Sequence, residues 1–165
     1  NKMIKKISEE HIVSDDLKLI KKDNKNIYLG KNYRYRGNMV NNQKHGIGIL
    51  EYDTCIGPIN IEGEWDTDSL VWSTITTDIF YFEGFVIDYY KLILMGKHIY
   101  KNGSEYNGKT IKLKRKGFGI LKQFNFIDLK TVWKNDLPNG IAIYTHCITG
   151  ESSSEIWKNG IRVNN

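Results

Sequence analysis

The sequence is poor in alanine and cysteine and has no long apolar run, and each shortage excludes a class of protein. A single alanine, Ala142, among 165 residues leaves too little helix-favouring material for a helical bundle. Cys55 and Cys147 lie 92 residues apart with no CxxC spacing, which excludes a disulfide framework or a zinc knuckle and favours a reducing compartment. No apolar run approaches the roughly 18–20 residues of a membrane-spanning helix. We therefore expect a soluble, cytoplasmic chain.

The abundant residues are those of strands and tight turns. Isoleucine occurs 23 times, and 12% of the residues are aromatic. Branched and aromatic side chains fit a pleated, half-buried surface, and glycine supplies the turns. With 40% hydrophobic residues the chain has enough apolar surface to fold. The composition predicts an all-β protein.

Charge is strongly segregated along the chain. The net charge is +5, but residues 51–90 carry nine acidic side chains and neither lysine nor arginine, whereas residues 1–50 sum to +6 and residues 91–165 to +8. Blocks of opposite sign steer association and select partners, rather than forming one continuous stripe for nucleic acid. We expect protein partners and no nucleic acid.

A motif of fixed spacing recurs along the chain. Tyr35 begins a Tyr-x-Gly triplet whose glycine is followed nine residues later by a Gly-x-Gly triplet at Gly46. The triplet beginning at Tyr106 is followed at the same offset by Gly117. With the tyrosine as position one, six units fit, at intervals of 26, 21, 24, 23 and 24 residues. A period in this range is the signature of a repeat protein.

Three alternate positions of the unit form columns. Position one holds Tyr35, Ile61, Phe82, Tyr106, Leu129 and Ser153. Position three holds Gly37, Gly63, Gly84, Gly108, Thr131 and Glu155. Position five holds Met39, Trp65, Val86, Thr110, Trp133 and Trp157. In the second half of the unit, Gly46 and Gly48 align with Gly117 and Gly119 and with Gly140 and Ala142, and the intervening Ile47, Phe118 and Ile141 are apolar each time.

The period of two within each unit predicts strands, and the polar turn between its halves predicts a β-hairpin. Glycine weakens a strand unless the missing side chain makes room, so we expect a neighbouring aromatic ring to lie over the bare backbone. An isolated hairpin is marginal in water, so the units must stack edge to edge. Six units of two strands each, at about 4.8 Å per strand, predict an elongated ribbon with a length of roughly 55–60 Å rather than a globule.

The N-terminal residues fall outside this pattern. We expect residues 1–26 to be a flanking segment and residues 27–165 to be the repeat array. Ser14, followed by Asp15 and Asp16, resembles a helix start, and residues 17–22 offer a short helix. Such a segment would cap the open edge of the sheet or dock on a partner.

The spacing, together with Lys44-His45-Gly46-x-Gly48, Trp133-Lys134-Asn135 and Trp157-Lys158-Asn159-Gly160, resembles an array of MORN repeats over residues 27–163. The likeness is strong in units one, four and five. In unit two, Trp72 and Thr74 replace the paired glycines of the Gly-x-Gly triplet, and in unit three Ile93 and Met95 replace them. This departure predicts a bulge or longer loop between residues 57 and 97. The resemblance implies an elongated, twisted antiparallel sheet without a catalytic centre, serving as a platform in cytoskeletal, ciliary or membrane-associated assemblies.

We therefore expect a non-enzymatic scaffold with no cofactor and no metal, and association between chains stays open. The partner contacts predicted from the sequence are aromatic anchors and the cations of residues 109–116, namely Trp65, Trp133, Trp157, Lys112, Lys114, Arg115 and Lys116. Packing over glycine is an alternative role for the rings, and a solvated turn is one for the cations. Two further functions stay open: an anionic-phospholipid tether through residues 109–116, and the targeting segment of a larger enzyme.

Overall fold

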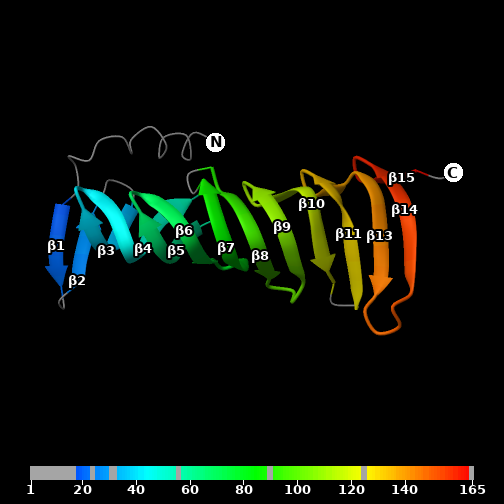
Figure 1. The fold of residues 1–165 in the computed structure, drawn as a ribbon, viewed down its shortest axis with the longest axis horizontal. Helices are drawn as coiled ribbons and strands as arrows, with labels where there is room; N and C mark the ends of the chain where they lie inside the picture. The colour runs from blue at the N-terminus through cyan, green and yellow to red at the C-terminus, as the bar shows by residue number, and fades with distance from the viewer. Residues whose placement is uncertain are drawn as a thin grey trace.

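The computed structural model describes residues 18–22, 25–29, 33–54, 57–88, 91–123 and 126–163. In these ranges the protein is all-β, with no helix, and its fifteen strands form one antiparallel sheet. Figure 1 shows the strands laid side by side along the long axis of an elongated ribbon. The predicted fold class is confirmed.

The strands follow one another in chain order across the sheet, except that the short β12 pairs only with β11. Their bounds are β1 Lys18–Lys22, β2 Lys25–Leu29, β3 Tyr33–Val40, β4 Gln43–Thr54, β5 Gly57–Asp66, β6 Ser69–Thr76, β7 Phe80–Asp88, β8 Ile93–Tyr100, β9 Glu105–Ile111, β10 Lys114–Lys122, β11 Ile127–Lys134, β12 Leu137–Pro138, β13 Gly140–His146, β14 Ser152–Lys158 and β15 Ile161–Val163.

The six predicted units are the six hairpins that begin at β3, β5, β7, β9, β11 and β14. Two-residue turns close most of them, with positive φ at both residues, as at Asn41 and Asn42 (49° and 61°) and at Asn135 and Asp136 (51° and 71°). This conformation matches the right-handed twist of the flanking strands, and asparagine tolerates it well. Lys112 and Leu113 adopt it too (50° and 65°), although neither residue favours it.

The N-terminal prediction needs a correction. Residues 18–22 form strand β1, which pairs antiparallel with β2 from Lys18↔Leu29 to Lys22↔Lys25, so the helix predicted over residues 17–22 is wrong there. Hydrogen bonding to the adjacent strand outweighs the local helix signal, because propensity alone is a weak determinant. The sheet thus begins before residue 27. Residues 1–17, including the predicted helix start at Ser14, lie outside the described residues.

The two faces of the sheet differ sharply. Position one of the repeat points to the face that we call the aromatic face, where Tyr35, Ile61, Phe82, Tyr106 and Leu129 are buried. Ser153 of the last unit is exposed. The buried residues form two clusters, one from Tyr35 to Leu94 and the other from Tyr106 to Ala142, and Tyr100 packs against both. The opposite face, called the open face here, carries the alternate residues.

Pairing of small residues extends into the units that look degraded in sequence. Gly37 pairs with Gly48 and Gly108 with Gly119, but Gly63 also pairs with Ser73, and Gly84 with Gly96. The alignment by sequence sets Trp72 and Thr74, and Ile93 and Met95, in place of the paired glycines. That prediction is wrong by one residue, because Ser73 and Gly96 are the residues that pair with Gly63 and Gly84. The bulge predicted between residues 57 and 97 is confirmed, and the register also shifts in the hairpins β3–β4 and β9–β10, so it belongs to the repeat.

Candidate functional site

Each tyrosine at position one lies against two glycines of its own hairpin. A Cβ atom placed on Gly108 would come within 2.7 Å of Tyr106 Cζ, and one on Gly119 within 2.6 Å of the same atom. Tyr35 lies in the same way over Gly37 and Gly48, at 2.7 and 2.6 Å. The prediction that glycines seat aromatic rings is confirmed, although each tyrosine ring belongs to the same hairpin and not to a neighbour.

The next hairpin supplies a tryptophan that packs against each of these tyrosine rings. Trp65 packs edge-on against Tyr35 with ring centroids 5.7 Å apart, and its Nε1 donates to the carbonyl of Gly48 at 3.3 Å. Trp133 packs against Tyr106 at 6.0 Å and donates to Gly119 at 3.3 Å. Both tryptophans are 3% exposed or less, so this structure places them in the core and not where a partner would find them. Trp157 is half-buried.

A cation held by a carboxylate covers each pair of rings. Lys44 Nζ lies 5.4 Å from the Trp65 ring centroid and 3.0 Å from Asp68 Oδ1. Arg115 Cζ lies 4.0 Å from the Trp133 centroid, and Arg115 Nε donates to Asp136 Oδ1 at 3.0 Å. In each case the carboxylate also accepts the backbone N–H of the cation's own residue. The Arg115 guanidinium therefore stabilises the joint between hairpins.

We expect Arg115→Ala to lower the free energy of unfolding by about 1–2 kcal/mol, because it removes a stacked, charge-assisted contact from a half-buried site. Lys112→Ala, in the adjacent turn, is the matched control and should change it by less than about 0.5 kcal/mol. Urea unfolding of both variants measures the difference. Equal midpoints would contradict the structural role given to Arg115.

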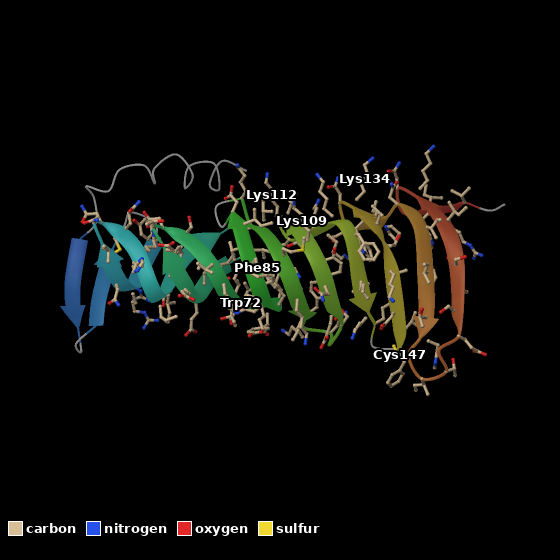
Figure 2. The ribbon with its side chains drawn as sticks, viewed as in Figure 1. Trp72, Phe85, Lys109, Lys112, Lys134 and Cys147 are labelled. Atoms are coloured by element: carbon tan, nitrogen blue, oxygen red, sulfur yellow. The ribbon has the colours of Figure 1, made fainter. Side chains whose placement is uncertain are left out.

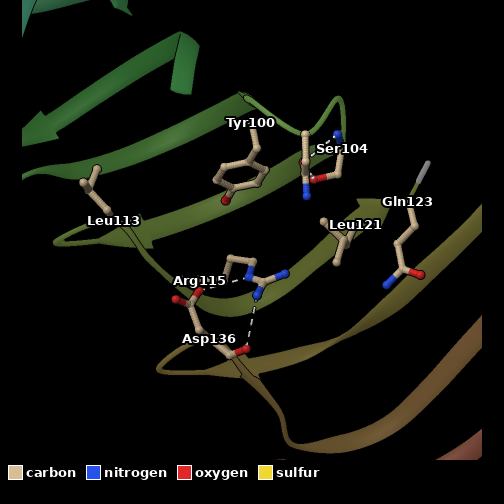
Figure 3. Close-up of a pocket in the computed structure, with 8 residues that line it drawn as sticks. Tyr100, Ser104, Leu113, Arg115, Leu121, Gln123 and Asp136 are labelled. Carbon is tan, nitrogen blue, oxygen red and sulfur yellow. Dashed lines mark hydrogen bonds and ion pairs between the residues drawn. The ribbon is translucent and has the colours of Figure 1, made fainter. Parts of the chain in front are cut away.

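A groove of about 590 Å³ lies beside this pair (Figure 3), lined by Tyr100, Asn102, Ser104, Leu113, Arg115, Leu121, Gln123 and Asp136. Burial raises the pKa of Tyr100, and it raises that of Tyr106 beneath Arg115 to about 12. Both phenols thus stay protonated. The hydroxyl of Ser104 donates to Asn102 Oδ1 at 2.6 Å, and an amide cannot serve as a base. These lining residues offer a contact surface and no nucleophile–base pair.

His98 is a buried residue that the repeat columns do not reveal. It is 1% exposed and pairs across the strands with Phe82 and Tyr106. Its Nε2 lies 3.0 Å from Thr110 Oγ1, and its ring centroid lies 4.8 Å from that of Phe82. Burial lowers the pKa of His98 to about 4, against the smaller opposite effect of the backbone at Gly96 and Tyr106. The imidazole is therefore neutral and part of the core.

The open face carries apolar side chains over its C-terminal strands. Four of them, called the C-terminal row here, lie on β11, β13, β14 and β15, where Ile141 pairs with Ile156 and Ile156 with Val163. The row consists of Val132, Ile141, Ile156 and Val163, all at least 43% exposed. Apolar residues between the paired small residues, such as Ile141 next to Ala142, are the sequence signal that points to this row.

Lysines surround the C-terminal row. The exposed lysines that alternation places on the open face of β10, β11 and β14 are Lys114, Lys116, Lys122, Lys130, Lys134 and Lys158. Lys112 is exposed in its turn, and Figure 2 shows Lys112 and Lys134 along one long edge of the ribbon, with Lys109 inward of that edge. Of the cations predicted to bind partners, Lys112, Lys114 and Lys116 face solvent, whereas Arg115 is held by Asp136.

A second apolar group lies at the centre of the open face. Trp72 and Phe85 meet edge to face with their centroids 5.2 Å apart (Figure 2), and Phe85 pairs with Met95 on the next strand. All three are at least 40% exposed. Clustered exposed aromatic residues of this kind are typical of interaction sites.

Neither a protein-family model nor a curated protein sequence matches the chain. Within the described residues, no group of three or more histidine, cysteine or acidic side chains is placed to hold a metal ion. No helix in the same ranges is long and apolar enough to cross a membrane. The acidic residues Glu62, Glu64 and Asp66 lie on one exposed side of β5, and Asp68 turns instead to Lys44.

Proposed function

We propose that this chain is a MORN-type repeat scaffold without catalytic activity, which binds a protein partner in the cytoplasm through the C-terminal row. The observation that carries the proposal is four exposed apolar side chains on adjacent strands, surrounded by lysines. Apolar anchors within a polar rim are the usual anatomy of a protein interface. The two-dozen-residue hairpins with tyrosine rings over paired glycines support the MORN assignment.

The charge around the row selects the partner. Lysines spread over three strands complement an acidic protein surface, which they would attract at long range and hold in register. An anionic membrane is the weaker candidate, because Arg115 of the basic cluster is held by Asp136 and is not free to bind a headgroup. We place the scaffold in a cytoskeletal or membrane-associated assembly whose acidic component it binds.

Site-specific photo-crosslinking in cells tests this proposal. A photoreactive amino acid at Ile141, on the row, should capture an acidic protein other than the chain itself, and Val132→Asp should abolish that product because it places a charge in the apolar contact. The same amino acid at Ile148, an exposed isoleucine in a turn 74% open to solvent, is the control and should not capture it. Equal capture at both positions would contradict the proposal. So would capture that survives Val132→Asp, or binding of anionic vesicles through the row.

A further inference from the structure

A row of side chains across the centre of the open face is symmetric in chemical character. We call it the central row, and it takes one residue from each strand from β4 to β10. Ile47 pairs with Glu64, and Glu64 with Trp72. After the contact of Trp72 with Phe85, Phe85 pairs with Met95 and Met95 with Lys109. The row is Ile47, Glu64, Trp72, Phe85, Met95 and Lys109, and it ends at Phe118, which lies in the bulge of β10 between Lys116 and Gly119.

Phe85 on β7 is the centre of this symmetry. One strand away on each side stands a large apolar residue, Trp72 or Met95. Two strands away stand charges of opposite sign, Glu64 and Lys109. Three strands away stand apolar residues again, Ile47 and Phe118, 68% and 66% exposed. Such a row is complementary to itself when its order is reversed.

We propose that two copies of this chain dock open face to open face, related by a twofold axis that runs parallel to the strands over β7. Rotation about this axis reverses the strand order, so Glu64 of one copy lies opposite Lys109 of the other. Trp72 then lies opposite Met95, and Ile47 opposite Phe118. Self-complementarity of one patch is the condition for a closed dimer with isologous contacts. This interface ends at Phe118, which pairs with Val132 of the C-terminal row, and it goes beyond the proposed function.

Charge selects this axis over the other twofold axis of two stacked sheets. An axis running across the strands would place Glu64 on Glu64 and Lys109 on Lys109, and like charges in contact oppose association. The axis along the strands instead sets Glu64 of β5 against Lys109 of β9, and it does so twice, once on each side of the axis. Glu83 meets its own copy near the axis, one like-charge contact against the two reciprocal Glu64–Lys109 contacts, and Lys97 beside it on β8 holds Glu105 at 3.4 Å.

The area is sufficient for a dimer. Seven strands at about 4.8 Å spacing span about 29 Å, and strands of seven to twelve residues at about 3.3 Å per residue give at least about 23 Å in the other direction. The patch is thus about 700 Å² per copy, close to the roughly 800 Å² that a standard interface buries on each side. Twisted sheets pack at about 30° to one another, so contact concentrates near the axis and β11–β15 remain open.

Charge reversal tests the interface, with sedimentation velocity measuring the mass of the purified chain from about 1 to 100 µM. The wild-type chain should form a dimer of twice 19.2 kDa. Glu64→Lys alone or Lys109→Glu alone should weaken dimerisation at least tenfold, because each places like charges opposite each other. The double variant should restore it. Within one chain these residues are four strand spacings, about 19 Å, apart, so restoration requires a second copy.

Two controls separate loss of the interface from loss of the fold. Lys101→Glu, in an exposed turn outside the row, should leave dimerisation unchanged, and circular dichroism should show equal thermal unfolding of all the reversed chains. The inference is overturned by a chain that stays monomeric at 100 µM, by single reversals without effect, or by a double variant that fails to recover. Because the charge reversals leave every side chain of the C-terminal row in place, crosslinking at Ile141 can succeed or fail independently.

Discussion

Gly108→Val is expected to lower the free energy of unfolding by at least about 3 kcal/mol. A Cβ on this residue would lie 2.7 Å from Tyr106 Cζ and 3.1 Å from the Cα of Gly119 on the paired strand. The ring cannot move away, because Trp133 packs against it from the next hairpin and the Tyr106 hydroxyl donates to Lys109 O at 3.2 Å. Overpacking of a filled core costs about 1–3 kcal/mol, and here it also breaks the joint between hairpins.

Chemical denaturation of Asn107→Val provides the matched control. Asn107 is the preceding residue on the same strand but is exposed on the open face, so the same substitution should change stability by less than about 0.5 kcal/mol. In a Tyr106→Leu background, Gly108→Val should cost much less, because the ring it displaces is gone. Equal costs with and without the ring would contradict the ring-over-glycine packing.

Acid is expected to destabilise the wild-type chain through His98. The pKa of this imidazole is about 4 in the folded protein, against 6.5 for an unperturbed histidine. Above pH 6.5 both states are neutral and no penalty arises. As pH falls from 6.5 to 4 the unfolded chain binds the proton and the folded chain does not, so stability falls by about 3 kcal/mol at 1.36 kcal/mol per pKa unit.

Replacing the histidine by the leucine found at the same place in other hairpins isolates this contribution. Leu50 and Leu121 occupy the equivalent buried position, each pairing with a tyrosine at position one. His98→Leu combined with Thr110→Val, which avoids an unpartnered hydroxyl, should gain about 3 kcal/mol over wild type between pH 7 and pH 4. Urea titrations at both values measure it. His45→Leu, at an exposed histidine, is the control, and the same gain there would contradict the assignment to His98.

The hairpins and the aromatic face could be predicted because they depend on local spacing. A period of two places Tyr106 and Gly108 on one face, and the offset to Gly117 and Gly119 fixes the return strand. The burial of Trp65 follows from the same column once the next hairpin is in place. Such features need only the sequence of a unit and its neighbour, which is why the repeat reveals them.

The features that could not be predicted depend on pairing across the sheet. Strand β1 forms because β2 is beside it, a contact that no helix start signal at Ser14 reports. The pairing of Gly84 with Gly96 lies one residue from the alignment by sequence, since a register shift within the hairpin displaces the return strand. The central row becomes visible only when residues as distant as Glu64 and Lys109 are set in register by the intervening strands.

The serial order of the hairpins has a mechanical consequence. Each described hairpin is hydrogen-bonded to the hairpins beside it in the chain, and the two ends of the described sheet lie at opposite ends of the ribbon (Figure 1). A tensile force between those ends loads one strand pair after another, so the sheet would open from its tips in steps. Each released hairpin of some two dozen residues would lengthen the chain by about 80 Å when fully extended. Such a ribbon would act as a stepwise extensible tether.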